Sequence, residues 1–339
     1  MKRRRYWLPL VACLALGAAW LGRRELRYAA RRSHPEAEFP VSMDDAARAR
    51  QRAREVGGRD PFLAALPPVG AGGAPMALVV EAAVIAPTAA GDILMRCMRR
   101  GGAEERMRQQ TGFGLESVDR VAFSDELAAL EGHFGGAVGA RLREAFQADG
   151  QASHGARAVI HTRSNAEGEP QALASWDERI LLNGKLSVVL AALDRMEGAD
   201  AGLPAVPEES AYGDAYGSLA AGTAADFLRD KLADVSAGLG RASRIDLHLR
   251  TKGTSRGDVL VVVDVTVPEA GARAELLGKL GNALLLGRGA ARARSDENAV
   301  AVADSARVSP VGDALRLEAA LPIESIAHWL SHCADTGPK

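Results

Sequence analysis

The sequence is poor in cysteine and in aromatic residues, and each shortage excludes a class of protein. Three cysteines in 339 residues are too few for a disulfide-rich scaffold, and no two of them are close enough in sequence for a zinc motif. Aromatic residues make up 4% of the chain, which leaves few anchors for a large protein interface. The sequence therefore predicts no metal site.

The three cysteines leave one pairing to consider. Cys13 lies in an apolar run near the N-terminus, so only Cys97 and Cys333 could form a disulfide within the body. Such a bridge would need an oxidising compartment. We favour two buried thiols on helices, because free cysteine is commonly a small buried residue.

Basic residues are scarce outside the N-terminus. Residues 1–32 hold 9 Lys and Arg and 1 acidic residue, whereas the rest of the chain holds 33 basic and 42 acidic residues. Affinity for nucleic acid is built from clustered Lys and Arg that contact phosphates. The acidic body argues against a nucleic-acid partner, while the arginines after residue 22 suit lipid headgroups.

The sequence also lacks complete nucleotide-binding and hydrolase motifs. Residues 183–187 contain Gly-Lys but lack the upstream glycine of a phosphate-binding loop, so we interpret Asn183 and Gly184 as a turn before a helix. Gly70 to Gly73 does not have dinucleotide-binding spacing. Ser236 lacks the glycine two residues earlier that a serine-hydrolase elbow needs. No cofactor is predicted, and catalytic residues stay unknown.

One long uncharged apolar run is present, at residues 6–22. Seventeen residues in a helix span about 25 Å, close to the hydrocarbon thickness of a bilayer. Basic residues stand at both ends of the run, where they can reach lipid headgroups. The run predicts a single-pass transmembrane anchor, with the lipid bilayer as its partner.

Three other interpretations of this run are available. Gly17-Ala18-Ala19 resembles the cleavage site of a signal peptide, and residues 10–13 have the shape of a lipoprotein signal. A buried core helix is disfavoured by the arginines at both ends. Basic residues are nearly balanced across the run, so a cytoplasmic body remains an alternative. We favour an inner-membrane protein with a periplasmic body, since most secreted chains begin with a short basic leader.

Composition divides the chain into four parts. These are an anchor at 1–32, a stalk and Pro- and Gly-rich linker at 33–75, a first lobe at 76–200 and a second lobe at 201–339. Each lobe is predicted as α+β, with helices packed on one face of a mainly antiparallel sheet. The expected strands lie at 77–85, 118–123, 127–134, 156–162, 171–176, 179–182, 245–250, 259–267, 306–308 and 314–321. The expected helices lie at 92–109, 138–146, 186–196, 225–235, 272–286, 296–304 and 323–333.

The two lobes have a similar order of elements, which predicts an internal repeat. The strand starts Val118-Asp119 and Ile245-Asp246 align at an offset of 127 residues. The helix starts at 139–141 and 271–273 align at an offset of 132 residues. The final helices of the two lobes align at an offset of 137 residues. Loop insertions would give such a drift in the offset.

The sequence resembles bacterial envelope-anchored α+β proteins of unknown function. The resemblance is carried by the anchor, the two lobes, the strand Val118 to Ala122 and the later Gly132-His133-Phe134. The resemblance covers most of residues 76–333. It implies location and architecture, and it transfers no catalytic residues.

A few polar residues were considered as site candidates. His328 and His332 share a helix face beside Cys333, but no third metal ligand accompanies them. His161 and His248 stand in alternating strands and are expected to face solvent. A further cluster was expected either to line a cleft between the lobes or to pack a joint there. It consists of Tyr212, Asp214 and Tyr216.

The sequence favours a membrane-anchored envelope protein that acts as a binding or scaffolding module. Its partner would be an envelope protein or a small ligand between the lobes. The alternative is an envelope hydrolase with dispersed catalytic residues, which would show convergent polar groups of perturbed pKa in a cleft.

Overall fold

The computed structural model describes most of the chain between Asp60 and Ile326. The described residues are 60–70, 72–100, 103–135, 138–165, 167–198, 205–207, 210–230, 232–251 and 258–326. No helix within these ranges is long enough and apolar enough to cross a bilayer. These ranges do not include the predicted anchor, the stalk before Asp60, His328, His332, Cys13 or Cys333. The anchor therefore stays a prediction, and so does the preference for free thiols at Cys97 and Cys333 over a disulfide.

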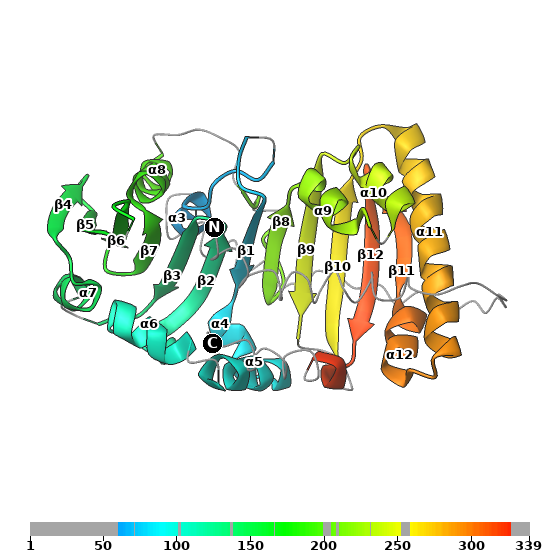
Figure 1. Ribbon diagram of the computed structural model, residues 1–339, viewed down its shortest axis with the longest axis horizontal. Helices are drawn as coiled ribbons and strands as arrows, with labels where there is room; N and C mark the ends of the chain where they lie inside the picture. Colours follow the sequence, from blue (N-terminus) through cyan, green and yellow to red (C-terminus); the bar gives the residue numbers. More distant parts are fainter. Residues whose placement is uncertain are drawn as a thin grey trace. The chain divides into compact units, whose positions relative to one another are not determined.

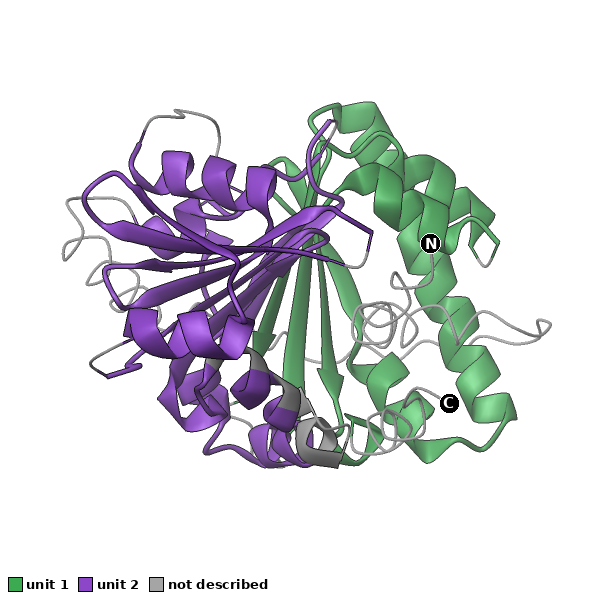
Figure 2. Ribbon diagram, turned by 60° about the vertical axis from the view of Figure 1, so that its left-hand side comes forward, with its two compact units in different colours: residues 1–40, 219–339 green, residues 41–218 purple. Residues whose placement is uncertain are grey.

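The described chain is α+β, as predicted, and its paired strands run antiparallel (Figure 1). It divides into two compact units (Figure 2). Unit 2 contains residues 41–218, and unit 1 contains residues 1–40 and 219–339. Each unit is described separately below.

Unit 2 contains a sheet with the strand order β8-β1-β2-β3-β7-β6-β5-β4. β2 and β3 form the predicted hairpin, and β5, β6 and β7 pair in sequence as a meander. The sequence prediction missed β4 and β8. The strands are β1 (Met76–Val80), β2 (Val118–Ser124), β3 (Leu127–Gly132), β4 (Gly150–His154), β5 (Ala158–Ser164), β6 (Pro170–Trp176), β7 (Ile180–Lys185) and β8 (Ala215–Leu219).

The helices of unit 2 agree closely with prediction at α7 and α8 and less well before them. The single helix expected at 92–109 is two helices, α5 and α6. The helices are α3 (Pro61–Ala64), α4 (Ala82–Ile85), α5 (Ala89–Arg100), α6 (Ala103–Thr111), α7 (Val138–Phe146) and α8 (Leu186–Met196), with a 3₁₀ turn η2 (Leu115–Ser117).

Both faces of the unit 2 sheet are buried. On β6, Leu173 belongs to an apolar cluster with Leu142 of α7, whereas the next residue, Ala174, belongs to a cluster with Val189 of α8. Successive side chains of a strand point to opposite faces, so α7 and α8 cover opposite faces of the sheet. The prediction of helices on one face only is therefore wrong for this unit.

Two local predictions in unit 2 are also wrong. Residues 61–66 have the composition of a linker, yet all six are buried, and Phe62 is completely inaccessible. Asn183 and Gly184 do not form a turn but continue β7, where Gly184 pairs with Leu127 of β3. A Cβ at Gly184 would lie 2.5 Å from the Glu126 carbonyl oxygen, so glycine is needed for close approach of the strands.

Unit 1 contains strands in the order β9-β10-β12-β11. β10 pairs with β9 and β12, which confirms the prediction that it is an interior strand. The strands are β9 (Arg244–Arg250), β10 (Val259–Thr266), β11 (Arg307–Val311) and β12 (Ala314–Leu321). The helices are α9 (Ala221–Leu228), α10 (Ala233–Leu239), α11 (Ala270–Ala293) and α12 (Glu297–Ser305), so the helix expected at 225–235 is two helices.

The two faces of the unit 1 sheet differ in chemistry. One face carries Ile245, Val265 and Leu315, which are buried with Leu276 of α11. The opposite face carries three ion pairs, two between neighbouring strands and one within β9. These are Arg316 with Asp264 at 2.8 Å, Arg307 with Glu318, and Arg244 with Asp246 at 2.7 Å.

The two units share a connectivity. In unit 2 the hairpin β2-β3 is followed by α7, and a later hairpin, β6-β7, returns to place β7 beside β3. In unit 1 the hairpin β9-β10 is followed by α11, and β11-β12 returns to place β12 beside β10. The sequence offsets align β2 with β9 and α7 with α11. Unit 2 adds β4 and β5 to this shared connectivity.

Candidate functional site

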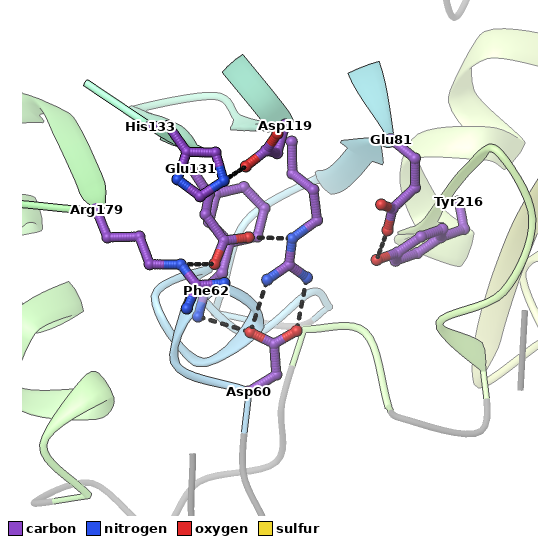
Figure 3. A network of polar contacts seen from close by, with 9 residues as sticks. Asp60, Phe62, Glu81, Asp119, Glu131, His133, Arg179 and Tyr216 are labelled. Atoms are coloured by element: carbon purple, nitrogen blue, oxygen red, sulfur yellow. Dashed lines mark hydrogen bonds and ion pairs between the residues drawn. The ribbon is translucent and has the colours of Figure 1, made fainter. Parts of the chain in front are cut away.

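A buried ion cluster surrounds Arg120 of β2 in unit 2 (Figure 3). The Arg120 guanidinium donates hydrogen bonds from its two terminal nitrogens to the Asp60 carboxylate, at 2.6 and 3.1 Å. Its Nε donates to Glu131 of the neighbouring strand β3. The Phe62 ring lies 4.5 Å from the guanidinium carbon, in cation–π geometry. Arg120 is therefore bound by two carboxylates and a ring.

The electrostatics of this cluster favour the charged guanidinium. Burial by itself lowers the pKa of Arg120, but the Asp60 and Glu131 carboxylates raise it well above its ordinary value. Glu131 also pairs with Arg179 at 3.3 Å, nearer the surface. His133 and Asp119 form a separate, exposed pair at 3.4 Å. The two buried carboxylates, Asp60 and Glu131, are thus compensated by the buried Arg120 and the half-exposed Arg179.

This cluster fixes the segment 60–66 to the sheet. Asp60 caps α3 by accepting a hydrogen bond from the Phe62 amide at 3.0 Å, and Pro61 suits the first helical position. From α8, Arg195 donates to the carbonyl oxygens of Ala64 and Ala65, at 3.2 and 2.7 Å. Because the buried guanidinium and carboxylates pair with one another and hold the segment 60–66 on the sheet, we assign the Arg120 cluster a structural role.

The predicted cluster of Tyr212, Asp214 and Tyr216 is also drawn into unit 2. Tyr216 is completely buried and donates a hydrogen bond to Glu81 at 2.9 Å (Figure 3). The Asp214 carbonyl oxygen accepts a hydrogen bond from the Glu81 amide at 2.9 Å. Tyr216 is thus a core residue whose hydroxyl group holds Glu81, the residue that follows β1.

A second polar region is a surface pocket of about 680 Å³ beside α7. Its walls come from α7, the turn that follows it, and strands β4 and β5. The residues that line it are Gly139, Ala140, Arg143, Glu144, Gln147, Ala148, Gln151, Val159 and His161.

His161 of β5 is the unusual residue of this pocket. Only 1% of its surface is exposed, and neither ring nitrogen makes a hydrogen bond of ordinary geometry, although the Gly139 backbone is close enough to raise its pKa. Burial and the positive charge of Arg143 lower the pKa of His161, and the nearby Gly139 carbonyl opposes this only in part. The imidazole is therefore neutral at pH 7, with one donor and one acceptor nitrogen unused.

The prediction that His161 and His248 face solvent is wrong. Both stand on the strand face opposite their most apolar neighbours, as alternation requires, but His161 is 1% exposed and His248 is 3% exposed. Alternation identifies the face of a strand, and it does not show whether that face is covered. His161 lies on the face of β5 that α7 covers.

The turn after α7 brings more polar groups to the pocket. Gln147 adopts a φ of +51°, a left-handed conformation that is uncommon for a residue other than glycine. The turn is closed by hydrogen bonds from the amides of Gln147 and Ala148 to the carbonyl oxygens of Glu144 and Arg143. This conformation places Gln147 among the residues that line the pocket.

The polar side chains around the pocket are not engaged with one another. Arg143, Glu144, Gln147 and Gln151 form no side-chain hydrogen bond or ion pair with the described part of the protein. In contrast, the charged groups of the Arg120 cluster satisfy one another. The pocket, rather than the cluster, therefore offers polar groups to a ligand.

Sequence reasoning missed both regions, although a signal existed for one of them. Arg120 alternates in phase with Val118 and Ala122, so a charged residue stands at a core position and requires buried partners. For the pocket, the lining residues come from three elements with ordinary surface composition. Within the described ranges, no three His, Cys, Asp or Glu residues gather as metal ligands.

Comparison with known proteins adds no relative to this description. No family model matches the chain, and neither the curated proteins nor the solved structures contain a significant match to it.

Proposed function

We propose that this chain is a membrane-anchored envelope protein whose unit 2 binds a small polar ligand in the pocket beside α7. The observation that supports binding is His161, a buried imidazole with two unpaired nitrogens at the pocket. A buried polar group without a partner costs about 1–3 kcal/mol of stability. A residue that lowers stability in this way is typical of a functional site.

The anchor is proposed from the sequence alone. The run at 6–22 tethers the body to the inner membrane by a single span, and the acidic body extends into the periplasm. In this arrangement the pocket is accessible to small molecules, or to the ends of larger ones, close to the membrane surface.

Binding requires a small movement of His161. Because both ring nitrogens are shielded from solvent, the imidazole must turn about its side-chain torsions to present a nitrogen to a ligand. Val159 precedes it by two residues on the same strand face and is only half buried, so the ring borders a region open toward solvent. The cost of this turn is offset by the hydrogen bonds that it creates.

A screen of small polar molecules against the full-length protein in detergent tests this proposal. We expect at least one molecule to raise the melting temperature in a saturable way, and His161→Leu to abolish the shift. His133→Leu is the matched control, because His133 is an exposed histidine of the same unit. Equal shifts in both variants would place binding elsewhere and contradict the proposal.

Topology is tested separately by thiol labelling. We would introduce Ser164→Cys, at an exposed residue of β5, in a chain with Cys97 and Cys333 replaced. Labelling by a membrane-impermeant reagent after the outer boundary alone is opened supports a periplasmic body. Labelling only after the inner membrane is broken would contradict it and favour a cytoplasmic body.

A hydrolase is the second candidate function. The neutral imidazole of His161, whose pKa is lowered, and the carboxylate of Glu144 both line the pocket, and an imidazole of this kind can accept a proton from water. Turnover of a bound ester or amide that is lost in His161→Leu would favour this candidate. Binding without turnover would favour the first.

A further inference from the structure

The charges of the α7 pocket restrict the ligand that it can hold. Arg143 supplies a cation and Glu144 an anion, while His161 is neutral, so the residues around the pocket have no net charge. Neither charged side chain forms an ion pair with another described residue. Opposite charges at one pocket that do not neutralise each other complement a ligand that also carries both signs.

The neutral polar groups lead to the same requirement. The amides of Gln147 and Gln151 each offer donors and an acceptor, and the His161 imidazole offers one of each. A ligand that only accepts hydrogen bonds would leave the acceptors of this set unpaired. A ligand with both donors and acceptors satisfies more of them.

We propose that the ligand is a small zwitterion of the amino-acid class, either a free α-amino acid or a short peptide with free ends. This inference rests on the binding function proposed above. Arg143 binds the carboxylate, because a guanidinium matches the two oxygens with paired donors. Glu144 accepts hydrogen bonds from the ammonium group, and His161 contacts the polar part between them.

Other ligand classes fit this set of residues less well. A simple anion would be attracted by Arg143 but repelled by Glu144, and a simple cation the reverse, so neither gains from both charges. A neutral sugar would form hydrogen bonds but gain from neither charge. The pocket volume of about 680 Å³ is within the range of small-molecule sites and accommodates a peptide of a few residues.

The test is calorimetric titration of the full-length protein in detergent with a panel of defined molecules. Glycine, L-alanine, L-glutamine and glycylglycine carry both charges. Acetate, methylammonium, inorganic phosphate and glucose are the comparison molecules. We expect saturable binding of at least one of the first four, and none of the comparison molecules to bind as tightly.

Charge-neutralising variants assign the two ends of the ligand. Arg143→Gln and Glu144→Gln each remove one charge from the exposed face of α7, and we expect each to weaken binding at least about tenfold. Glu167→Gln and Arg229→Gln are the controls, because both positions are exposed and neither lines the pocket. Binding in these controls should match that of the unchanged protein.

The outcomes separate the ligand class from the proposed function. Binding of glucose, phosphate or acetate that depends on His161 but not on Glu144 overturns the zwitterion and preserves the pocket. Zwitterion binding that is unchanged in His161→Leu, Arg143→Gln and Glu144→Gln overturns both. The absence of saturable zwitterion binding up to about ten millimolar overturns the ligand class.

Discussion

The two units have the same strand connectivity but bury their sheets differently. In unit 2, apolar clusters lie on both faces, whereas in unit 1 one face is apolar and the other carries paired charges. The difference is visible in two of the strands, although β10 of unit 1 is apolar from Val259 to Val263. β7 begins Ile180-Leu181-Leu182, whereas β9 alternates Ile245-Asp246-Leu247. A sheet covered on both faces needs continuous apolar strands, and a sheet with one polar face needs alternating ones.

The comparison also locates the candidate site. The strands β4 and β5 belong to unit 2 alone, and the α7 pocket is built from these two strands and the helix beside them. The shared connectivity thus supplies a scaffold, and the additional strands supply polar side chains. Four predictions test this division, from the largest expected effect to the smallest.

Removing the guanidinium of Arg120 should have the largest effect on stability. Arg120→Gln leaves the Asp60 carboxylate buried without its counter-charge and leaves Glu131 paired only with the half-exposed Arg179, so we expect a loss of about 3–5 kcal/mol in the free energy of unfolding. Urea denaturation measures it. Arg316→Gln on the polar face of unit 1 is the control, with a loss of about 1 kcal/mol, because that pair is partly exposed.

Truncation of Leu181 tests the second apolar face of unit 2. Leu181 is 1% exposed and lies in the cluster beneath α7, so Leu181→Ala should cost about 2–5 kcal/mol. Leu260→Ala in β10 is its counterpart on the polar face of unit 1 and should cost about 1 kcal/mol. Equal losses in urea denaturation would contradict the difference between the units.

The two buried histidines should respond to the same substitution with opposite signs. His161→Leu removes an unpaired polar group, so we expect a gain of about 1 kcal/mol in the free energy of unfolding. His248→Leu removes a ring that lies 3.9 Å from Asp264, so we expect a loss of about 1 kcal/mol. Destabilisation by His161→Leu would show that the ring contributes to packing rather than to a site.

The smallest expected effect is on the pH dependence of the free energy of unfolding. The pKa of His161 is lowered in the folded unit, so the unfolded chain binds the proton more readily. Stability from this group is complete above its ordinary pKa near 6.5, and it is lost as the pH falls from there toward the lowered value. Arg143 of α7 is the charged group that acts on the ring, and Glu144 lines the same pocket. His161→Leu should reduce the slope of stability against pH.

Much of the architecture was predictable because it depends on local patterns. The hairpin from Val118 onward, α7, α8 and β12 follow from alternation, helical periodicity and turn residues. The burial of residues 60–66 did not follow, because Pro and Gly nearby suggested a linker. Their burial depends on Arg120 and Arg195, which are distant in sequence.

The candidate site was predictable only in part. The strand position and facing direction of His161 followed from alternation, but its burial depends on the packing of α7 over β5. No spacing in the sequence links residue 161 with Arg143 or Gln151. Their proximity is created by the antiparallel pairing of β4 with β5, in which Gln151 is opposite His161.

The contact between Asp60 and Arg120 has a mechanical consequence. Asp60 joins the buried segment 60–66 to strand β2, so a pull on this segment reaches the Asp60–Arg120 pair. Its carboxylate is bound by two guanidinium nitrogens at once, and paired hydrogen bonds of this kind share a load and rupture together rather than one after the other. A force that lifts the segment is therefore transmitted to strand β2 inside the sheet before the segment can peel away.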